Sequence, residues 1–222
     1  LDQEVDRFLT GLIGRHFPGH RILSEESRSE ITSENWSTGP LWIIDPIDGT
    51  ANFVRGIGLF CIAVAFYNGG VAEAAAVYDP SHDEMFIALR GQGASLNGRQ
   101  IRVSAVDTLN RALLATGFPY ERTPGQDNTD HVAHLVPLVS DLRRSGTGIL
   151  DMAWVACGRF DGYFEHDIPP WDAAAGAILV QEAGGRVTNY QGGRYDPFQR
   201  DLCATNGSLH EGLVSVLLKG TS

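Results

Sequence analysis

The stretch that decides the fold runs over residues 41–50 and reads LWIIDPIDGT. Its first four residues are apolar, which predicts a short buried strand. The strand ends at a turn that carries Asp45 and Asp48, with a stiffening proline between them and with Gly49 allowing close approach of another backbone. The segment that Thr50 opens suits a short helix, so its first N–H groups are available to an anion.

Two carboxylates pinned on one turn repel each other unless a cation lies between them. Oxygen ligands favour Mg²⁺, Mn²⁺ or Ca²⁺ over zinc. The alternative is a surface turn in which each Asp accepts hydrogen bonds from backbone N–H groups, and a lone D-x-x-D-G is more often that. The metal hypothesis therefore depends on acidic residues elsewhere in the chain.

Two other segments of the sequence carry acidic residues that could join the same site. The segment Ser24-Glu25-Glu26-Ser27 follows an apolar pair, and Asp172 begins a run of small residues, WDAAAG, that suits a helix. Taken singly, Asp172 is typical of a helix cap and the Glu pair is typical of a solvated surface. Their joint presence with the turn at Asp45 and Asp48 is what makes a shared site plausible.

The remaining elements indicate layered helices and sheets with both pairing directions. The first half begins with a helix and continues as an antiparallel meander with a tight turn at Asn97-Gly98. The second half alternates strands with helices. The expected helices are 3–17, 128–142 (shortened or kinked by Pro137), 147–157, 172–183 and 208–218, and the expected strands are 59–67, 71–79, 85–90, 112–118, 161–168, 186–190 and 201–206.

Composition excludes several classes of protein. The 222 residues hold 17 basic and 27 acidic side chains and a net charge of −10, which disfavours nucleic acid and anionic membranes as partners. No apolar run approaches the roughly 18 residues of a membrane span, and the charged start is unlike a signal peptide. The three cysteines lack metal-ligand spacing and are expected to be small buried hydrophobes, in a cytoplasmic protein. His131 and His134 are expected to share an exposed helix face.

Three spaced segments together resemble the inositol monophosphatase family of metal-dependent, lithium-sensitive phosphatases. They are EES at 25–27, WIIDPIDGTANF at 42–53 and WDAAAGAILVQEAGG at 171–185, and GQGASLNGRQIRVS (91–104) and RFDGYFE (159–165) are also similar to the family. The resemblance implies an α+β fold, a layered αβαβα sandwich of the sugar-phosphatase type with mixed and antiparallel sheets. It implies one domain over 1–222, divisible at most into 1–110 and 111–222, with the family's N-terminal helix missing or truncated.

The resemblance also implies a role for each matching residue. Glu25 would bind metal and, with Thr50, orient the attacking water. Asp45 would bridge two metals, and the Ile47 carbonyl would complete one coordination sphere. Asp48 and Asp172 would bind the second metal. Substrate contacts are expected from Asp48, Gly49, Thr50, Thr147, Gly148 and Glu165. For Glu165, a residue that reads a substrate hydroxyl, the alternative is an exposed strand carboxylate or an ion pair with an arginine.

These inferences predict Mg²⁺-dependent hydrolysis of a small phosphate monoester by metal-activated water, with myo-inositol 1-phosphate as the first candidate. Fructose 1,6-bisphosphate, histidinol phosphate or a 3′-phosphonucleotide are alternatives within the same class. A non-catalytic regulatory binding protein on the same scaffold is the alternative from another class. Two or three Mg²⁺ ions are expected, with Mn²⁺ as a substitute and with Ca²⁺ and Li⁺ as inhibitors. The resemblance further suggests a homodimer.

Overall fold

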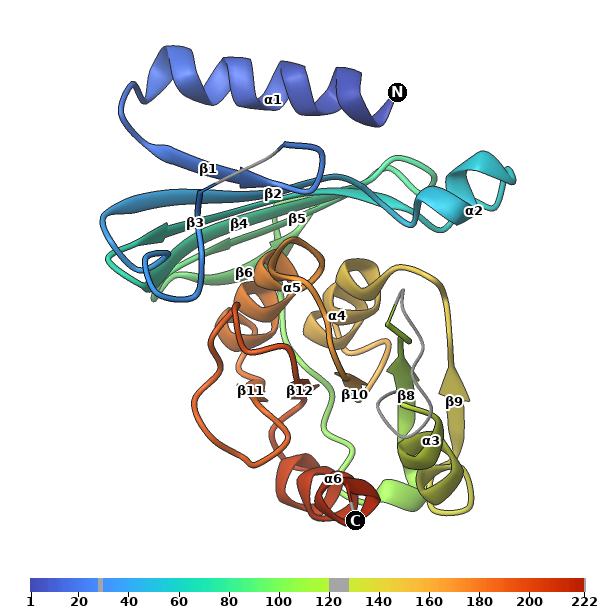
Figure 1. Ribbon diagram of the computed structural model, residues 1–222. Helices are drawn as coiled ribbons and strands as arrows, with labels where there is room; N and C mark the ends of the chain where they lie inside the picture. The colour runs from blue at the N-terminus through green and yellow to red at the C-terminus, as the bar shows by residue number, and fades with distance from the viewer. Residues whose placement is uncertain (28–29, 120–127, 222) are drawn as a thin grey trace.

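The structure is a computed structural model that describes residues 1–27, 30–119 and 128–221. Five layers follow one another in Figure 1: helix α1, a first sheet, helices α4 and α5, a second sheet, and helices α3 and α6. This is the αβαβα sandwich that the resemblance implied, and that prediction is confirmed. Among the described residues, no helix combines the length and the apolar character needed to cross a bilayer.

The first sheet has seven strands in sequence order, so it is the predicted meander with one added strand at its edge. Only the edge pair, β1 with β2, is parallel; each later strand is antiparallel to the one before it. The turn between the last two strands is at Asn97-Gly98, whose φ angles are 48° and 76°. The strands are β1 (Arg21–Ser24), β2 (Pro40–Asp48), β3 (Cys61–Asn68), β4 (Val71–Asp79), β5 (Glu84–Leu89), β6 (Gly93–Leu96) and β7 (Arg99–Ile101).

The second sheet has five strands in the order β11-β12-β10-β8-β9. Strand β8 is parallel to both of its neighbours, and β12 is antiparallel to both of its own. Both pairing directions therefore occur, as the alternation of strands and helices predicted. The strands are β8 (Leu113–Thr116), β9 (Asp141–Arg143), β10 (Gly162–Glu165), β11 (Arg186–Thr188) and β12 (Leu202–Thr205).

Helices α4 (Gly148–Ala156) and α5 (Pro170–Glu182) fill the space between the sheets (Figure 1). Small residues allow them to approach closely: a Cβ on Gly176 of α5 would lie 2.7 Å from Met152 of α4. Both helices contribute to one apolar core that includes residues of the first sheet and of the second. The division of the chain into domains stays a prediction.

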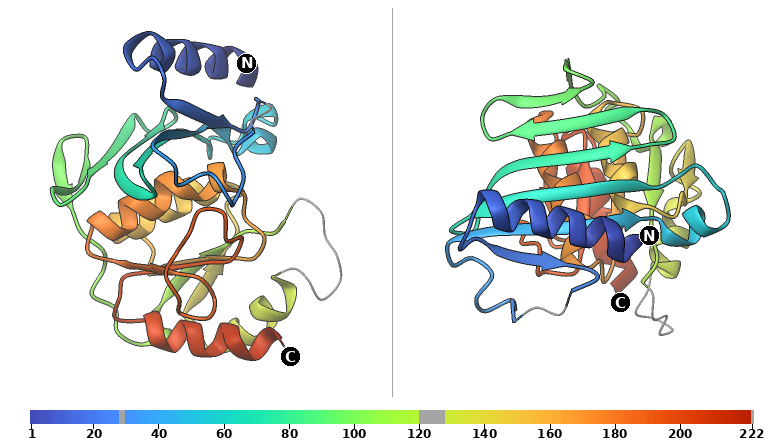
Figure 2. Two further views of the ribbon diagram at one scale, coloured as in Figure 1. Left: turned by 60° about the vertical axis from the view of Figure 1, so that its left-hand side comes forward. Right: turned by 90° about the horizontal axis from the view of Figure 1, so that it is seen from above.

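The remaining helices lie on the outer surfaces. Helix α1 (Asp2–His16) crosses the outer face of the first sheet, and Figure 2 shows it over the blue strands while the green ones are left open on that face. Helices α3 (Thr129–Leu135) and α6 (His210–Leu217) cover the second sheet, and α2 (Thr50–Val54) follows β2. Two short 3₁₀ helices, η1 (Leu109–Arg111) and η2 (Leu218–Thr221), complete the order.

Some local expectations were wrong. The helix predicted over 128–142 is shortened, as Pro137 indicated, and ends at Leu135; the prediction was wrong only in its last residues, where β9 begins. His131 is buried, with its Nε2 bonded to the carbonyl oxygen of Leu217 at 3.1 Å, so it does not share an exposed face with His134. The burial follows from α3 packing against α6, which single-helix periodicity does not report. Of the three cysteines, Cys157 is only partly buried.

Candidate active site

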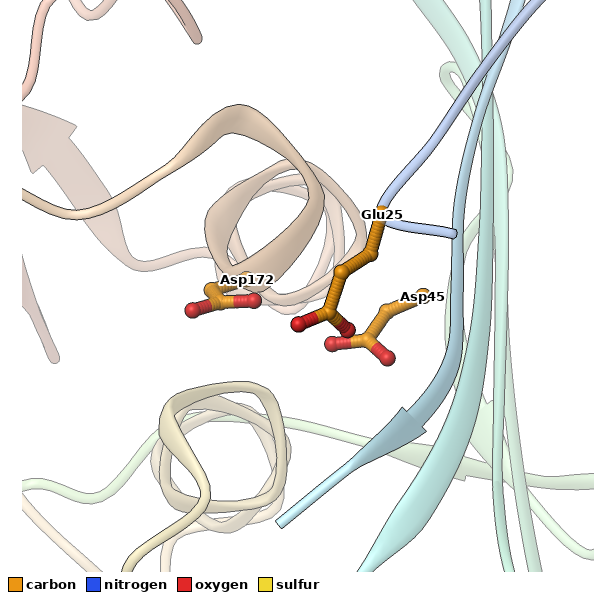
Figure 3. Close-up of side chains that lie close together, drawn as sticks. All are labelled: Glu25, Asp45 and Asp172. Atoms are coloured by element: carbon orange, nitrogen blue, oxygen red, sulfur yellow. The ribbon is translucent and has the colours of Figure 1, made fainter. Parts of the chain in front are cut away.

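Three carboxylates from three separate elements converge beside the end of β2. Glu25 lies directly after β1, Asp45 lies within β2, and Asp172 lies in the first turn of α5. Each offers an oxygen, and these oxygens lie within 4.8 Å of one another. Figure 3 shows the carboxyl groups of Glu25 and Asp45 next to each other, with Asp172 facing them from the helix. We call Glu25, Asp45 and Asp172 the carboxylate cluster.

Strand pairing explains how Glu25 reaches Asp45 from a position 20 residues earlier in the sequence. The parallel register places Ser24 opposite Ile44, so the next residue of each strand falls at the same level. The amide of Glu25 donates a hydrogen bond to the Ile44 carbonyl at 3.4 Å, which extends the pairing by one residue. Asp172, the third member, comes from the helix layer. Pro169 and Pro170 set the position of the first turn of α5, in which it lies.

The cluster is electrostatically unfavourable as bare carboxylates. Asp45 is 1% exposed, and neither of its oxygens accepts a hydrogen bond within the described part of the chain. Burial and then repulsion by Asp48 raise the pKa of Asp45 and of Asp172 well above the usual range. Burial, followed by the charges of Glu26 and Asp48, raises the pKa of Glu25 to about 7.

A buried acceptor without a donor loses its hydration and gains nothing in return. A divalent cation that prefers oxygen ligands would remove this cost, because it binds the ionised carboxylates directly. The residues of the carboxylate cluster therefore fit a Mg²⁺-type ion on grounds of burial, charge and donor chemistry.

Asp48 lies close to the carboxylate cluster, and its hydrogen bonds come from residues at the start of α4. Its Oδ2 accepts hydrogen bonds from the Thr147 hydroxyl at 2.5 Å and from the Ile149 amide at 2.9 Å, both at the start of α4. The thiol of Cys61 lies 3.9 Å from the same oxygen. Burial raises the pKa of Asp48 to about 6, and these hydrogen bonds oppose the rise.

The turn after Asp48 has the conformation that its sequence indicates. Gly49 has a φ of 91°, and a Cβ there would lie 2.8 Å from the Leu59 carbonyl oxygen, so only glycine fits. Thr50 begins α2, and its hydroxyl donates to the Ile47 carbonyl at 2.9 Å. The side chain of Thr50 is exposed, whereas Ile47 is buried.

A cleft opens beside the carboxylate cluster, and all six predicted substrate residues line it together with Asp172, which was predicted as a metal ligand. The six are Asp48, Gly49, Thr50, Thr147, Gly148 and Glu165. Thr147 contributes little surface, being 2% exposed, and its hydroxyl is bonded to Asp48. In the same cleft, the hydroxyl of Tyr163 donates a hydrogen bond to Glu165. A Cβ on Gly148 would lie 2.6 Å from that hydroxyl, so glycine leaves room for this pair.

The model of the inositol monophosphatase family matches residues 1–221. The chain belongs to this family. An inositol-1-monophosphatase of Synechocystis sp. is 38% identical over 97% of this chain and 75% of that protein. The Nus factor SuhB of Salmonella typhimurium is 40% identical over 93% of this chain and 76% of that protein. A solved inositol monophosphatase from Anabaena (Nostoc) sp. superposes with a TM-score of 0.92 and 42% identity, covering 98% of this chain and 86% of that one.

Membership of the inositol monophosphatase family confirms the resemblance that the three segments carried. The family consists of metal-dependent phosphatases, which agrees with a cluster whose buried oxygens fit a divalent cation. The individual roles of the site residues stay predictions.

The cleft of this inositol monophosphatase family member also includes residues that the sequence did not predict, among them Gly117, Arg144, Asp151 and Tyr163. Asp151 is buried and its Oδ1 accepts no hydrogen bond within the described residues, while Arg144 supplies positive charge beside it. One signal was available for Asp151, the single charged residue in the apolar run GILDMAWVA. Gly117 carries no comparable signal, because its closeness to Glu165 arises only from the pairing of β8 with β10.

Proposed function

We propose that this protein is a Mg²⁺-dependent phosphatase for a small polyol phosphate, with myo-inositol 1-phosphate as the first candidate substrate. The observation that carries the proposal is the carboxylate cluster, in which the two oxygens of Asp45 accept no hydrogen bond from the described residues. The cluster lies beside a cleft that Thr50 and Glu165 also line. Phosphoryl transfer depends mainly on positioning and on charge neutralisation, which such a cluster provides once it is loaded with metal.

The ligands fall into two overlapping sets. Glu25, Asp45 and the Ile47 carbonyl would hold one ion, and Asp45, Asp48 and Asp172 would hold another. When bound, these ions would supply an acidified attacking water and positive charge for the phosphoryl group and the leaving oxygen. Two or three Mg²⁺ ions are proposed, with Mn²⁺ as a substitute. Ca²⁺ would inhibit because its coordination is larger and looser, and Li⁺ inhibition is proposed from family membership.

The chain's own groups would bind and orient the reactants. Thr50 is exposed at the cleft with its hydroxyl on the Ile47 carbonyl, which suits a role with Glu25 in aiming the water. The amides at the start of α2, after Gly49, would face the phosphate. Within the cleft lining, Glu165 would accept a hydrogen bond from a hydroxyl of the substrate. Gly148 would leave room for the substrate beside it.

Other activities remain as alternatives within this proposal. Fructose 1,6-bisphosphate, histidinol phosphate and a 3′-phosphonucleotide offer the same phosphate chemistry with different leaving groups. A regulatory binding function is the second candidate, because a relative at 40% identity carries the name Nus factor. A cytoplasmic homodimer that binds neither membrane nor nucleic acid completes the proposal, and sedimentation at micromolar concentration would test the dimer.

A substrate panel tests the proposal. Phosphate release is measured from the four candidate substrates at equal phosphate concentration, with Mg²⁺ and then with a chelator in excess. We expect turnover of myo-inositol 1-phosphate to be greatest, and all turnover to stop in chelator. Turnover of none of the four would overturn the catalytic proposal and favour the regulatory one. Turnover that persists in chelator would overturn the metal dependence.

A further inference from the structure

One oxygen of Asp48 is fully engaged by groups at the start of α4, about 100 residues further along the chain. Its Oδ2 accepts from the Thr147 hydroxyl at 2.5 Å and from the Ile149 amide at 2.9 Å, with the Cys61 thiol at 3.9 Å. Hydrogen bonds to an ionised acceptor are short and roughly twice as strong as neutral ones. This arrangement fixes the rotation of the carboxyl group, because turning it would break all of these hydrogen bonds.

Thr147 is itself held in place by its surroundings. Its hydroxyl accepts a hydrogen bond from the Leu150 amide at 3.4 Å and so caps α4. The Ser145 hydroxyl bonds both the carbonyl and the amide of Thr147, each at 3.2 Å. Asn52 of α2 donates to the Ser145 carbonyl at 2.9 Å, so the loop is tied to the turn that carries Asp48.

We propose that Thr147 is a positioning residue for the metal centre, and that its hydroxyl orients Asp48 toward the ion shared with Asp45 and Asp172 instead of contacting the substrate. This inference rests on the proposed function. The Thr147 side chain is 2% exposed, and its hydroxyl is already bonded at both its donor and its acceptor side. Removing the hydroxyl would leave the Ile149 amide as the remaining close donor to Asp48, so the carboxyl group would be held less firmly toward the metal.

The test compares Thr147→Val, which keeps the shape and loses the hydroxyl, with Thr147→Ser, which keeps the hydroxyl. Binding of Mn²⁺ is measured by titration calorimetry on each purified protein without substrate. Loss of a group that orients a metal ligand costs about ten- to a hundredfold in metal affinity. We expect that loss for one class of Mn²⁺ site in Thr147→Val, and affinity close to wild type in Thr147→Ser. Thr147→Ala, which fits the same space, serves if the valine variant does not fold.

Ser145→Ala is the matched control, since it loosens the same loop but removes no hydrogen bond to Asp48. Its Mn²⁺ affinity should change by less than about threefold, because the serine side chain bonds the Thr147 backbone and the Asp151 carboxyl group and makes no hydrogen bond to Asp48. Kinetics then separate the two roles: a positioning role raises the half-saturating Mg²⁺ concentration and leaves KM unchanged at saturating Mg²⁺. A raised KM with unchanged Mn²⁺ binding would overturn the inference and make Thr147 a substrate-binding residue. Absence of Mn²⁺ binding in the wild-type protein would instead overturn the proposed function.

Discussion

Tyr163 and Glu165 lie on the same face of β10, and the tyrosine hydroxyl donates a hydrogen bond to the glutamate carboxylate. Alternation along a strand puts residues two apart on one face. Glu165 is 9% exposed, and it makes no ion pair with an arginine in the part of the chain that the structure describes. Burial raises its pKa to about 7, against the effect of the Tyr163 hydrogen bond. The burial of this carboxylate in the cleft wall favours a role in binding a substrate hydroxyl over the alternative of an exposed strand carboxylate.

The first prediction concerns substrate discrimination by this carboxylate. Glu165→Gln should lower kcat/KM for a polyol phosphate by about ten- to a hundredfold, because a hydrogen bond to a charged acceptor contributes roughly 1.5–3 kcal/mol. The same variant should hydrolyse p-nitrophenyl phosphate, which lacks a hydroxyl, nearly as fast as wild type. Steady-state kinetics on both substrates check this. Equal losses on the two would mean that Glu165 supports the site as a whole.

A second prediction follows from the glycine that faces Glu165 across the strand pair. A Cβ on Gly117 would overlap the Glu165 carboxylate, although the backbone of Gly117 needs no left-handed angle. Gly117→Ala should therefore displace the carboxylate and reproduce the selective loss on the polyol phosphate. Gly14→Ala, in the last turn of α1, is the control, since no atom lies within 4 Å of its new Cβ and alanine is a better helix former than glycine. Wild-type selectivity in Gly117→Ala would contradict the geometry.

The third prediction concerns the charge at the centre of the carboxylate cluster. Asp45→Asn should lower phosphatase activity by several orders of magnitude, because a neutral amide cannot bridge two cations. We expect Mg²⁺ to raise the melting temperature of the wild-type protein and not that of the variant. Without metal, the variant should be at least as stable as wild type, since buried repulsion is relieved. If the variant keeps a tenth of wild-type activity, the assignment of Asp45 to metal is wrong.

The fourth prediction concerns a histidine outside the cleft. His210 is fully buried, its ring nitrogens lie 2.9 Å from the hydroxyls of Thr188 and Thr205, and burial with nearby Arg186 lowers its pKa to about 4. In the unfolded chain this histidine binds a proton below about pH 6.5, whereas in the folded protein it stays neutral to a lower pH. Stability from neutral His210 is thus present above that pH and is lost as the pH falls toward 4.

Urea unfolding between pH 4 and 7 measures this contribution as the difference between wild type and His210→Gln. The difference in the free energy of unfolding should shrink on acidification by at most about 1.4 kcal/mol per pH unit. Taking the difference cancels the carboxylates of the cleft, whose raised pKa values have the opposite effect on stability. A difference that does not vary with pH would show that His210 is not held neutral by the fold.

Local patterns were sufficient for much of the chain. The helix expected over 3–17 is α1, and the strand expected over 71–79 has the bounds of β4, because each signal depends on side chains a few residues apart. The motif around Asp45 also indicated metal chemistry, because two carboxylates so close in the sequence are expected to repel each other unless a cation lies between them. Short strands such as β1 and β9 were not predicted, because three or four residues carry no periodicity until a neighbouring strand pairs with them.

The finer arrangement of the site depends on contacts between distant segments. Glu25 meets Asp45 through a parallel register, and Asp172 joins them because α5 packs between two sheets. The bond from Thr147 to Asp48 spans 99 residues, and no spacing in the sequence encodes which carboxylate oxygen accepts it. Residue type and periodicity specify which groups can ionise and which faces are buried, whereas the packing of the layers specifies which ionisable groups meet and from which side each is held.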